Sequence, residues 1–189
     1  HAQTAVEAAI ALHPLVAGRI GEIDRIVIET QESGKRIIDK TGPLANPADR
    51  DHCIQYMVAI PLLKGSLTAA DYEDDAAADP RVDALRAKME VVENAAFTTD
   101  YLDPAKRSIG NAIQISFRDG TSTARVEVEY PVGHRRRRPE GIPLLKAKFE
   151  GALRSRIPAR PAEEILRLFA DESLLDPIRV DRLMDLFAI

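Results

Sequence analysis

One stretch of the sequence, NPADRDHCIQYM, begins at Asn46 and carries side chains that could do chemistry. Asn46 can cap a helix and Pro47 is favoured at its first position, so a helix is predicted to begin there. Asp49, His52 and Tyr56 follow at i, i+3 and i+7 and would share one helix face. An acid, an imidazole and a phenol could then meet one ligand. The alternative is that these residues form the solvated first turns of an otherwise buried helix.

Two other places carry candidate side chains. His1 opens an Ala-rich segment, where it could act as a general acid or contact an anion, or simply cap a helix. Four arginines, Arg135 to Arg138, stand in the connection GHRRRRPEG. They could bind carboxylates or another subunit, or form a solvated loop. No second His or carboxylate lies at ligand spacing near His52, so no metal site is predicted.

Composition excludes several classes of protein. The 189 residues carry a formal net charge of −4, and no aromatic residues interleave with the arginine run, which argues against a nucleic-acid partner. The single cysteine, Cys53, cannot form an internal disulfide or supply an iron–sulfur cluster alone, so a reducing, cytoplasmic setting is expected. No segment approaches the roughly 20 apolar residues that span a bilayer, so no membrane partner is expected. The sequence opens without an initiator Met, which suggests a piece of a longer protein.

Hydrophobic periodicity predicts helices together with a mostly antiparallel sheet. NAIQISF (111–117) and ARVEVEY (124–130) alternate apolar and polar residues around an Asp119-Gly120 turn, as in a hairpin with one buried face. From Pro139 the period becomes helical, and three amphipathic helices are predicted to close the chain. The other predicted elements are a helix over 2–12 that ends at Pro14, a strand over 22–30, an extended piece around Ile37 and Ile38, the helix from Pro47 to Gly65, two short helices over 68–71 and 79–88, a solvated acidic loop between them, and a possible strand over 89–94.

The fold class is therefore α+β, with a boundary near residue 136. Residues 1–136 would form a small α+β domain, and residues 137–189 a helical tail. The apolar stripes of the tail run through Leu145, Phe149 and Leu153.

Several runs of the sequence resemble the C-terminal part of the MmgE/PrpD family. They are HAQTAVEAA, TGPLANPADRDHCIQYMVAIPLLKGSLTAADYEDD, DGTSTARVEVEYPVGHRRRR and GIPLLKAKF, and the resemblance covers essentially the whole chain. It implies a large helical domain, made by an N-terminal portion together with the C-terminal helices, and a small α+β domain between them. It also implies a homodimer and an active site in the cleft between the domains.

The resemblance implies a hydro-lyase that removes water from the tricarboxylate 2-methylcitrate, giving 2-methyl-cis-aconitate in propionate catabolism, without a metal or other cofactor. Tyr56 falls on the family's active-site tyrosine in a run of the form HxxQY, and His1 falls on a histidine near the cleft. His52 matches some members, and we assign it and Arg135 to substrate binding. Where members often carry a GHPxNP-type loop, this chain has GHRRRR. The remaining catalytic groups are expected before residue 1.

Two hypotheses follow. In the first, the chain is the C-terminal portion of such a dehydratase and is inactive by itself. In the second, it is a stand-alone binding module that captures an acidic metabolite through His1 and the arginines Arg135 to Arg138.

Overall fold

A computed structural model describes residues 1–188 and divides them into two compact units. The first unit is His1–Pro131, and the second begins at Val132. The domain boundary predicted near residue 136 concerns the full-length protein and stays a prediction.

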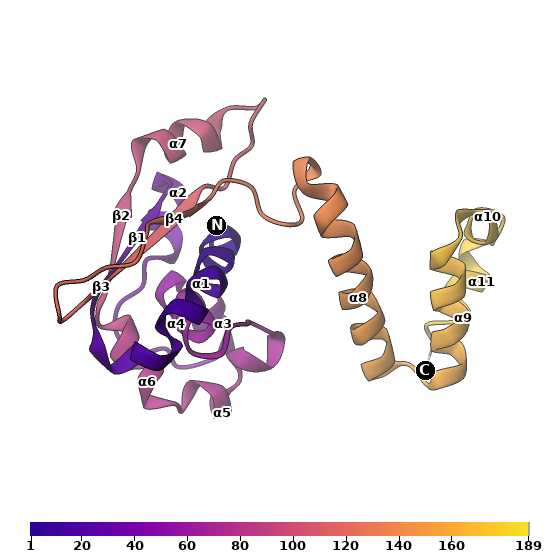
Figure 1. Cartoon of the computed structure of the whole chain (residues 1–189). Helices are drawn as coiled ribbons and strands as arrows, with labels where there is room; N and C mark the ends of the chain where they lie inside the picture. Colours follow the sequence, from indigo (N-terminus) through magenta and orange to yellow (C-terminus); the bar gives the residue numbers. More distant parts are fainter. Residues whose placement is uncertain (189) are drawn as a thin grey trace. The chain divides into compact units, whose positions relative to one another are not determined.

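A four-stranded sheet forms the frame of the first unit (Figure 1). Its order is β2-β1-β3-β4, with β1 parallel to β2 and antiparallel to β3, and with β3 antiparallel to β4. The prediction of an α+β fold with a mostly antiparallel sheet is confirmed. The strands are β1 (Ile23–Thr30), β2 (Met89–Glu93), β3 (Asn111–Phe117) and β4 (Val126–Val128).

Side-chain alternation explains why the sheet has one buried face. Ile26 and Ile28 of β1 pair with Ile115 and Ile113 of β3, and all four side chains are fully buried. The residues between them turn to the other face, where charged pairs such as Arg25 with Glu90 lie in solvent. One face of the sheet is therefore apolar and must be covered by helices.

Helices of the first unit precede and connect these strands. They are α1 (Gln3–Val16), α2 (Glu32–Ile38), α3 (Pro47–Asp51), α4 (Ile54–Lys64), α5 (Asp74–Ala77), α6 (Pro80–Arg86) and α7 (Ala95–Leu102), with the 3₁₀ turns η1 (Ala17–Glu22) and η2 (Ala69–Tyr72). Residues 124–130 were predicted as a full strand, but only Val126–Val128 pair as β4.

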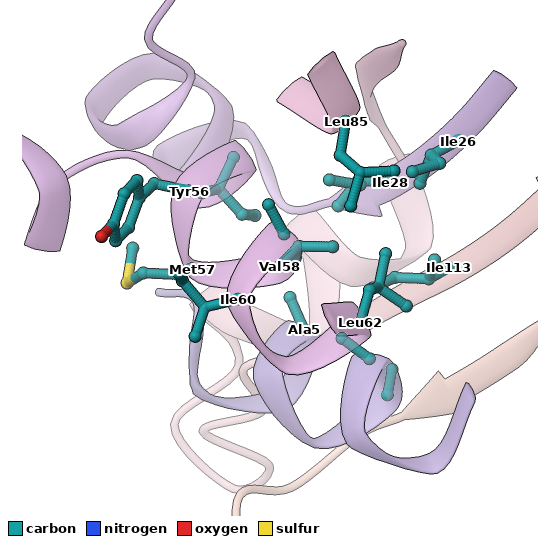
Figure 2. Close-up of a cluster of buried hydrophobic side chains, with 14 of the residues drawn as sticks. Ala5, Ile26, Ile28, Tyr56, Met57, Val58, Ile60, Leu62, Leu85 and Ile113 are labelled. Atoms are coloured by element: carbon teal, nitrogen blue, oxygen red, sulfur yellow. The ribbon is translucent and has the colours of Figure 1, made fainter. Parts of the chain in front are cut away.

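The core lies between the sheet and the helices α1, α4 and α6. The small side chains of Ala5 and Ala8 let α1 pack closely on α4, and α4 is buried from Ile54 to Leu62. Figure 2 shows Val58 and Leu62 of α4 directed toward Ile28 and Ile113 of the sheet, while Tyr56 lies at one edge of the cluster with its hydroxyl pointing away.

The structure corrects two predicted helix limits. α1 does not end at Pro14 but continues to Val16, because a proline in the last turn removes only one helical hydrogen bond. The segment around Ile37 and Ile38 is not extended but forms α2, whose apolar residue Ile38 is buried while Ile37 is exposed.

The helix predicted from Pro47 to Gly65 is two helices. α3 ends at Asp51, and Cys53 adopts an extended conformation before α4 begins. Nδ1 of His52 lies 3.2 Å from the carbonyl oxygen of Ala48, the acceptor that a continuing helix would offer to a backbone N–H. The predicted start at Asn46 is confirmed, because the Asn46 side chain accepts a hydrogen bond from the backbone N–H of Asp49.

Two helices of the first unit were not predicted at all. α7 follows β2 and begins at Asn94, whose side chain accepts hydrogen bonds from Ala96 and Phe97. α5 forms one turn within the acidic segment that was expected to be a solvated loop.

The second unit is helical, as predicted. A small core of Leu153, Ala162 and Ile165 joins its helices, and the rings of Phe149 and Phe169 lie 5.1 Å apart. Leu145 remains 51% exposed, so the predicted stripe of the first tail helix is only partly covered within this unit. The elements are η3 (Arg135–Arg137), α8 (Arg138–Arg156), α9 (Ala159–Ala170), α10 (Glu172–Leu175) and α11 (Val180–Asp185). Within residues 1–188, no helix combines the length and apolar character needed to cross a membrane.

Candidate functional site

His1 lies just before α1, beside the carboxyl end of β1 and the start of β3. Its Nδ1 is 2.9 Å from Nε2 of Gln31, and its carbonyl oxygen accepts a hydrogen bond from Nδ2 of Asn111 at 2.9 Å. The ring of Tyr101, on α7, stands 5.7 Å from the imidazole ring. The side chain and the backbone of His1 are therefore both fixed by groups from other elements.

The polar groups that hold His1 are themselves buried. Thr4, Thr30, Gln31 and Asn111 are all inaccessible to solvent. The Thr30 hydroxyl donates to Oε1 of Gln31 at 2.5 Å, and Nδ2 of Asn111 donates to the Thr4 hydroxyl at 2.6 Å. A hydrogen-bonded cluster of this kind is rigid, because an unpaired buried polar group is costly.

Tyr56, on α4, is fixed differently. Its hydroxyl donates to the backbone carbonyl of Asp71 at 2.5 Å, and only 2% of the residue is exposed. Its ring lies 6.1 Å from the ring of Tyr72. Burial raises the pKa of Tyr56, so the phenol keeps its proton at neutral pH.

Asp71 occupies the third position of a capping box at the N-terminus of η2, whose cap residue is Thr68. Its carboxylate accepts hydrogen bonds from the backbone N–H and the hydroxyl of Thr68, both at 2.8 Å, and from Nζ of Lys64 at 2.6 Å. Burial alone would raise the pKa of Asp71, but the bonds from Lys64 and Thr68 outweigh it and the pKa is lowered. The carbonyl that accepts from Tyr56 is thereby held in place by this carboxylate.

The shared face proposed for Asp49, His52 and Tyr56 is wrong, because the chain breaks between α3 and α4. Asp49 instead accepts from the backbone N–H of Ala45 and from Nζ of Lys40, which lowers its pKa. His52 is exposed and contacts the carboxylate of Asp51.

Three of the predicted site residues thus have separate surroundings within the first unit. His1 contacts Gln31, Asn111 and Tyr101, whereas Tyr56 contacts Asp71 and Tyr72, and His52 contacts Ala48 and Asp51. The structure does not bring them to one point. Their roles as catalytic or binding groups stay predictions.

Arg135 lies in the second unit, in the 3₁₀ turn η3. The ring of His134 caps this turn by accepting from the backbone N–H of Arg136, and Arg137 pairs with Glu140 at 2.8 Å. Arg135 itself is exposed. Its assignment to substrate binding stays a prediction.

A cavity of about 390 Å³ lies elsewhere in the first unit, lined in part by Lys40, Gln55 and Arg86. His1, His52 and Tyr56 are not part of its wall. Within residues 1–188, no group of three or more His, Cys, Asp or Glu side chains is placed to hold a metal ion.

A model of the MmgE/PrpD C-terminal domain matches residues 1–173 of this sequence. The chain belongs to the MmgE/PrpD family. The resemblance carried by the sequence runs above is therefore confirmed at the level of the family.

Members of the family that are named 2-methylcitrate dehydratase match the chain along its whole length. The Cupriavidus necator protein is 57% identical over 192 residues, which cover 100% of the chain and 40% of the relative. The Escherichia coli K12 protein is 54% identical with the same coverage. A Saccharomyces cerevisiae protein, named a probable 2-methylcitrate dehydratase, is 50% identical over 99% of the chain and 37% of its own length. The chain thus spans about 40% of the length of these MmgE/PrpD relatives.

Sequence reasoning missed the residues that hold the candidate groups. Gln31 directly follows a strand, and Asp71 stands three residues after Thr68, a spacing typical of a helix cap. The capping pattern could have drawn attention to Asp71. Nothing in the spacing of Gln31, 30 residues from His1, indicates that the two side chains meet.

Proposed function

We propose that this chain is the C-terminal portion of a 2-methylcitrate dehydratase that removes water from 2-methylcitrate. The observation that carries the proposal is identity above one half to relatives of that name along the whole chain. Because the chain spans about 40% of those relatives, the full reaction is assigned to the longer protein and not to this portion alone.

The reaction sets clear chemical requirements. A base removes a proton from the carbon next to a carboxylate, the electron pair forms the C=C bond, and hydroxide leaves the neighbouring carbon with a proton from an acid. Three substrate carboxylates also need cations or N–H donors. His1 and Tyr56 supply an imidazole and a phenol, which can serve as donors in such a site.

Within the proposal, His1 binds a carboxylate and Tyr56 donates to, or positions, the departing hydroxyl. The raised pKa of Tyr56 supports a donor role, since the phenol stays protonated. The Tyr56 hydroxyl donates its hydrogen bond to the Asp71 carbonyl. To donate to the substrate, the hydroxyl must first release this carbonyl. His52 and Arg135 are assigned to binding of the anionic substrate, and both are exposed.

The proposal has further parts. The N-terminal helical portion of the same enzyme would complete the site, two copies would associate, and no cofactor would take part. A cytoplasmic setting belongs to the proposal too, and rests on the single cysteine, Cys53, which is buried and makes no disulfide.

A chimera tests the function of this chain directly. The chain replaces the matching part of the Cupriavidus necator relative, and absorbance of the conjugated product reports turnover of 2-methylcitrate. We expect activity within about tenfold of the unmodified relative, a change of about 1.4 kcal/mol in the barrier. The chain expressed by itself should show no turnover. A folded chimera without dehydratase activity, or an isolated chain with activity near that of the relative, would contradict the proposal.

A further inference from the structure

The hydrogen bond between Thr30 and Gln31 determines which way the Gln31 amide faces. Oγ1 of Thr30 lies 2.5 Å from the nearest atom of the Gln31 amide group. This distance is found for O–H···O hydrogen bonds and is shorter than the usual range for N–H···O hydrogen bonds. The atom of Gln31 next to the threonine is therefore its oxygen. The opposite orientation would also leave the buried Thr30 hydroxyl without an acceptor.

This orientation places the amide nitrogen of Gln31 against His1. Nε2 of Gln31 can only donate, so Nδ1 of His1, at 2.9 Å, must accept with its lone pair. A neutral imidazole carries one proton, which must then be on the other nitrogen, Nε2. Thr30, Gln31 and His1 form a chain of hydrogen bonds in which each partner fixes the next.

The backbone around this chain is shaped to hold it. Gly34, on α2, lies so close that an added Cβ would stand 2.6 Å from Oγ1 of Thr30 and 2.7 Å from Oε1 of Gln31. Only glycine leaves room for the pair. Asn111 donates a hydrogen bond to the backbone carbonyl of His1. A shift of the His1 backbone that carried the imidazole away from Gln31 would break this bond.

We propose that Gln31 is a positioning residue that holds His1 as its Nε2–H tautomer, so that Nε2–H donates a hydrogen bond to a carboxylate of the substrate. This assignment rests on the proposed function for its substrate, but the tautomer itself rests on the contacts of Gln31 alone. In this state His1 is a donor and not a base, which leaves abstraction of the C–H proton to another group of the full-length enzyme.

Nitrogen NMR of the chain tests the tautomer. The chain has four histidines, so substituting each in turn assigns every imidazole signal after labelling with ¹⁵N-histidine. A short N-terminal extension keeps the free α-amine away from His1. In the unmodified chain, we expect the Nδ1 signal of His1 at the position of an unprotonated ring nitrogen and the Nε2 signal at that of a protonated one.

Two variants separate positioning from general structure. Gln31→Glu replaces the donor by an acceptor, so Nδ1 of His1 should become protonated. Thr30→Val removes the hydroxyl that orients the amide, so a fraction of Nδ1–H should appear. Gln114→Glu is the matched control, because it makes the same change on an exposed residue of β3 and should leave the His1 signals unchanged.

The outcomes distinguish this inference from the proposed function. Protonated Nδ1 in the unmodified chain, or unchanged His1 signals in both folded variants, would overturn the role of Gln31. If Gln31→Glu inverts the protonation and also lowers turnover of the chimera, both proposals stand. If Gln31→Glu moves the proton of His1 to Nδ1 but turnover of the chimera is unchanged, Gln31 still positions His1, but His1 has no part in the reaction.

Discussion

Replacing Tyr56 by phenylalanine should lower the free energy of unfolding of the first unit, because the hydrogen bond of the Tyr56 hydroxyl is lost. The ring and its packing remain, while the hydroxyl that donates to the Asp71 carbonyl at 2.5 Å is lost. Tyr56 is 2% exposed, so water cannot readily replace the lost donor. Leaving a buried acceptor unpaired costs about 1–3 kcal/mol, and we expect a loss of unfolding free energy in this range.

Urea unfolding followed by circular dichroism measures this loss. If the free energy of unfolding falls by about 2 kcal/mol per molar urea, the urea concentration at the unfolding midpoint should fall by about 0.5–1.5 M. Hydrogen exchange of the α4 amides locates the change in the first unit. Tyr72→Phe is the matched control, because no hydrogen bond of the Tyr72 hydroxyl is found within residues 1–188. A shift below about 0.2 M, or equal shifts in both variants, would refute the argument.

In the chimera, Tyr56→Phe should lower kcat by about 100-fold if the hydroxyl acts as a general acid, and a folded variant with unchanged kcat would leave Tyr56 a purely structural role. His52→Ala should lower kcat less than Tyr56→Phe, since His52 is exposed and lies outside the contacts of Tyr56; an equal or larger loss would mean that His52 is the catalytic residue of the two. Gly34→Ala should lower stability by about 1–3 kcal/mol through its clash with Thr30 and Gln31, whereas Gly151→Ala in α8, where an added Cβ meets nothing within 4 Å, should raise it by about 1 kcal/mol in thermal unfolding. The stability advantage of the native chain over Asp71→Asn should be present above about pH 4 and decrease as the pH falls through the lowered pKa of Asp71; an advantage that does not decrease on acidification would contradict the ion pair with Lys64.

Strands β1 and β3 and the helix start at Asn46 could be predicted because their causes are local. The alternation of β1 and β3 comes from residues two apart, and the Asn46 cap comes from residues three apart. The break at Cys53 could not be predicted from the sequence, because no glycine or proline stands between Asp49 and Met57 to mark the end of a helix. α2 was mistaken for an extended piece since its adjacent isoleucines suggest a strand, while its helical hydrogen bonds depend on its position after β1.

The candidate site shows a second limit, which comes from distance along the chain. Residue type alone drew attention to His1 and Tyr56, because imidazole and phenol carry chemistry wherever they stand. What each group can donate or accept depends on partners 30 and 15 residues away, namely Gln31 and Asp71. Nothing in the sequence links Gln31 to His1, and the capping pattern that marks Asp71 does not indicate that its carbonyl meets Tyr56. The structure adds these partners and with them the direction of each hydrogen bond: the Tyr56 hydroxyl donates to a carbonyl oxygen, and in the tautomer proposed for His1 its Nδ1 accepts from Gln31 while the proton stays on Nε2.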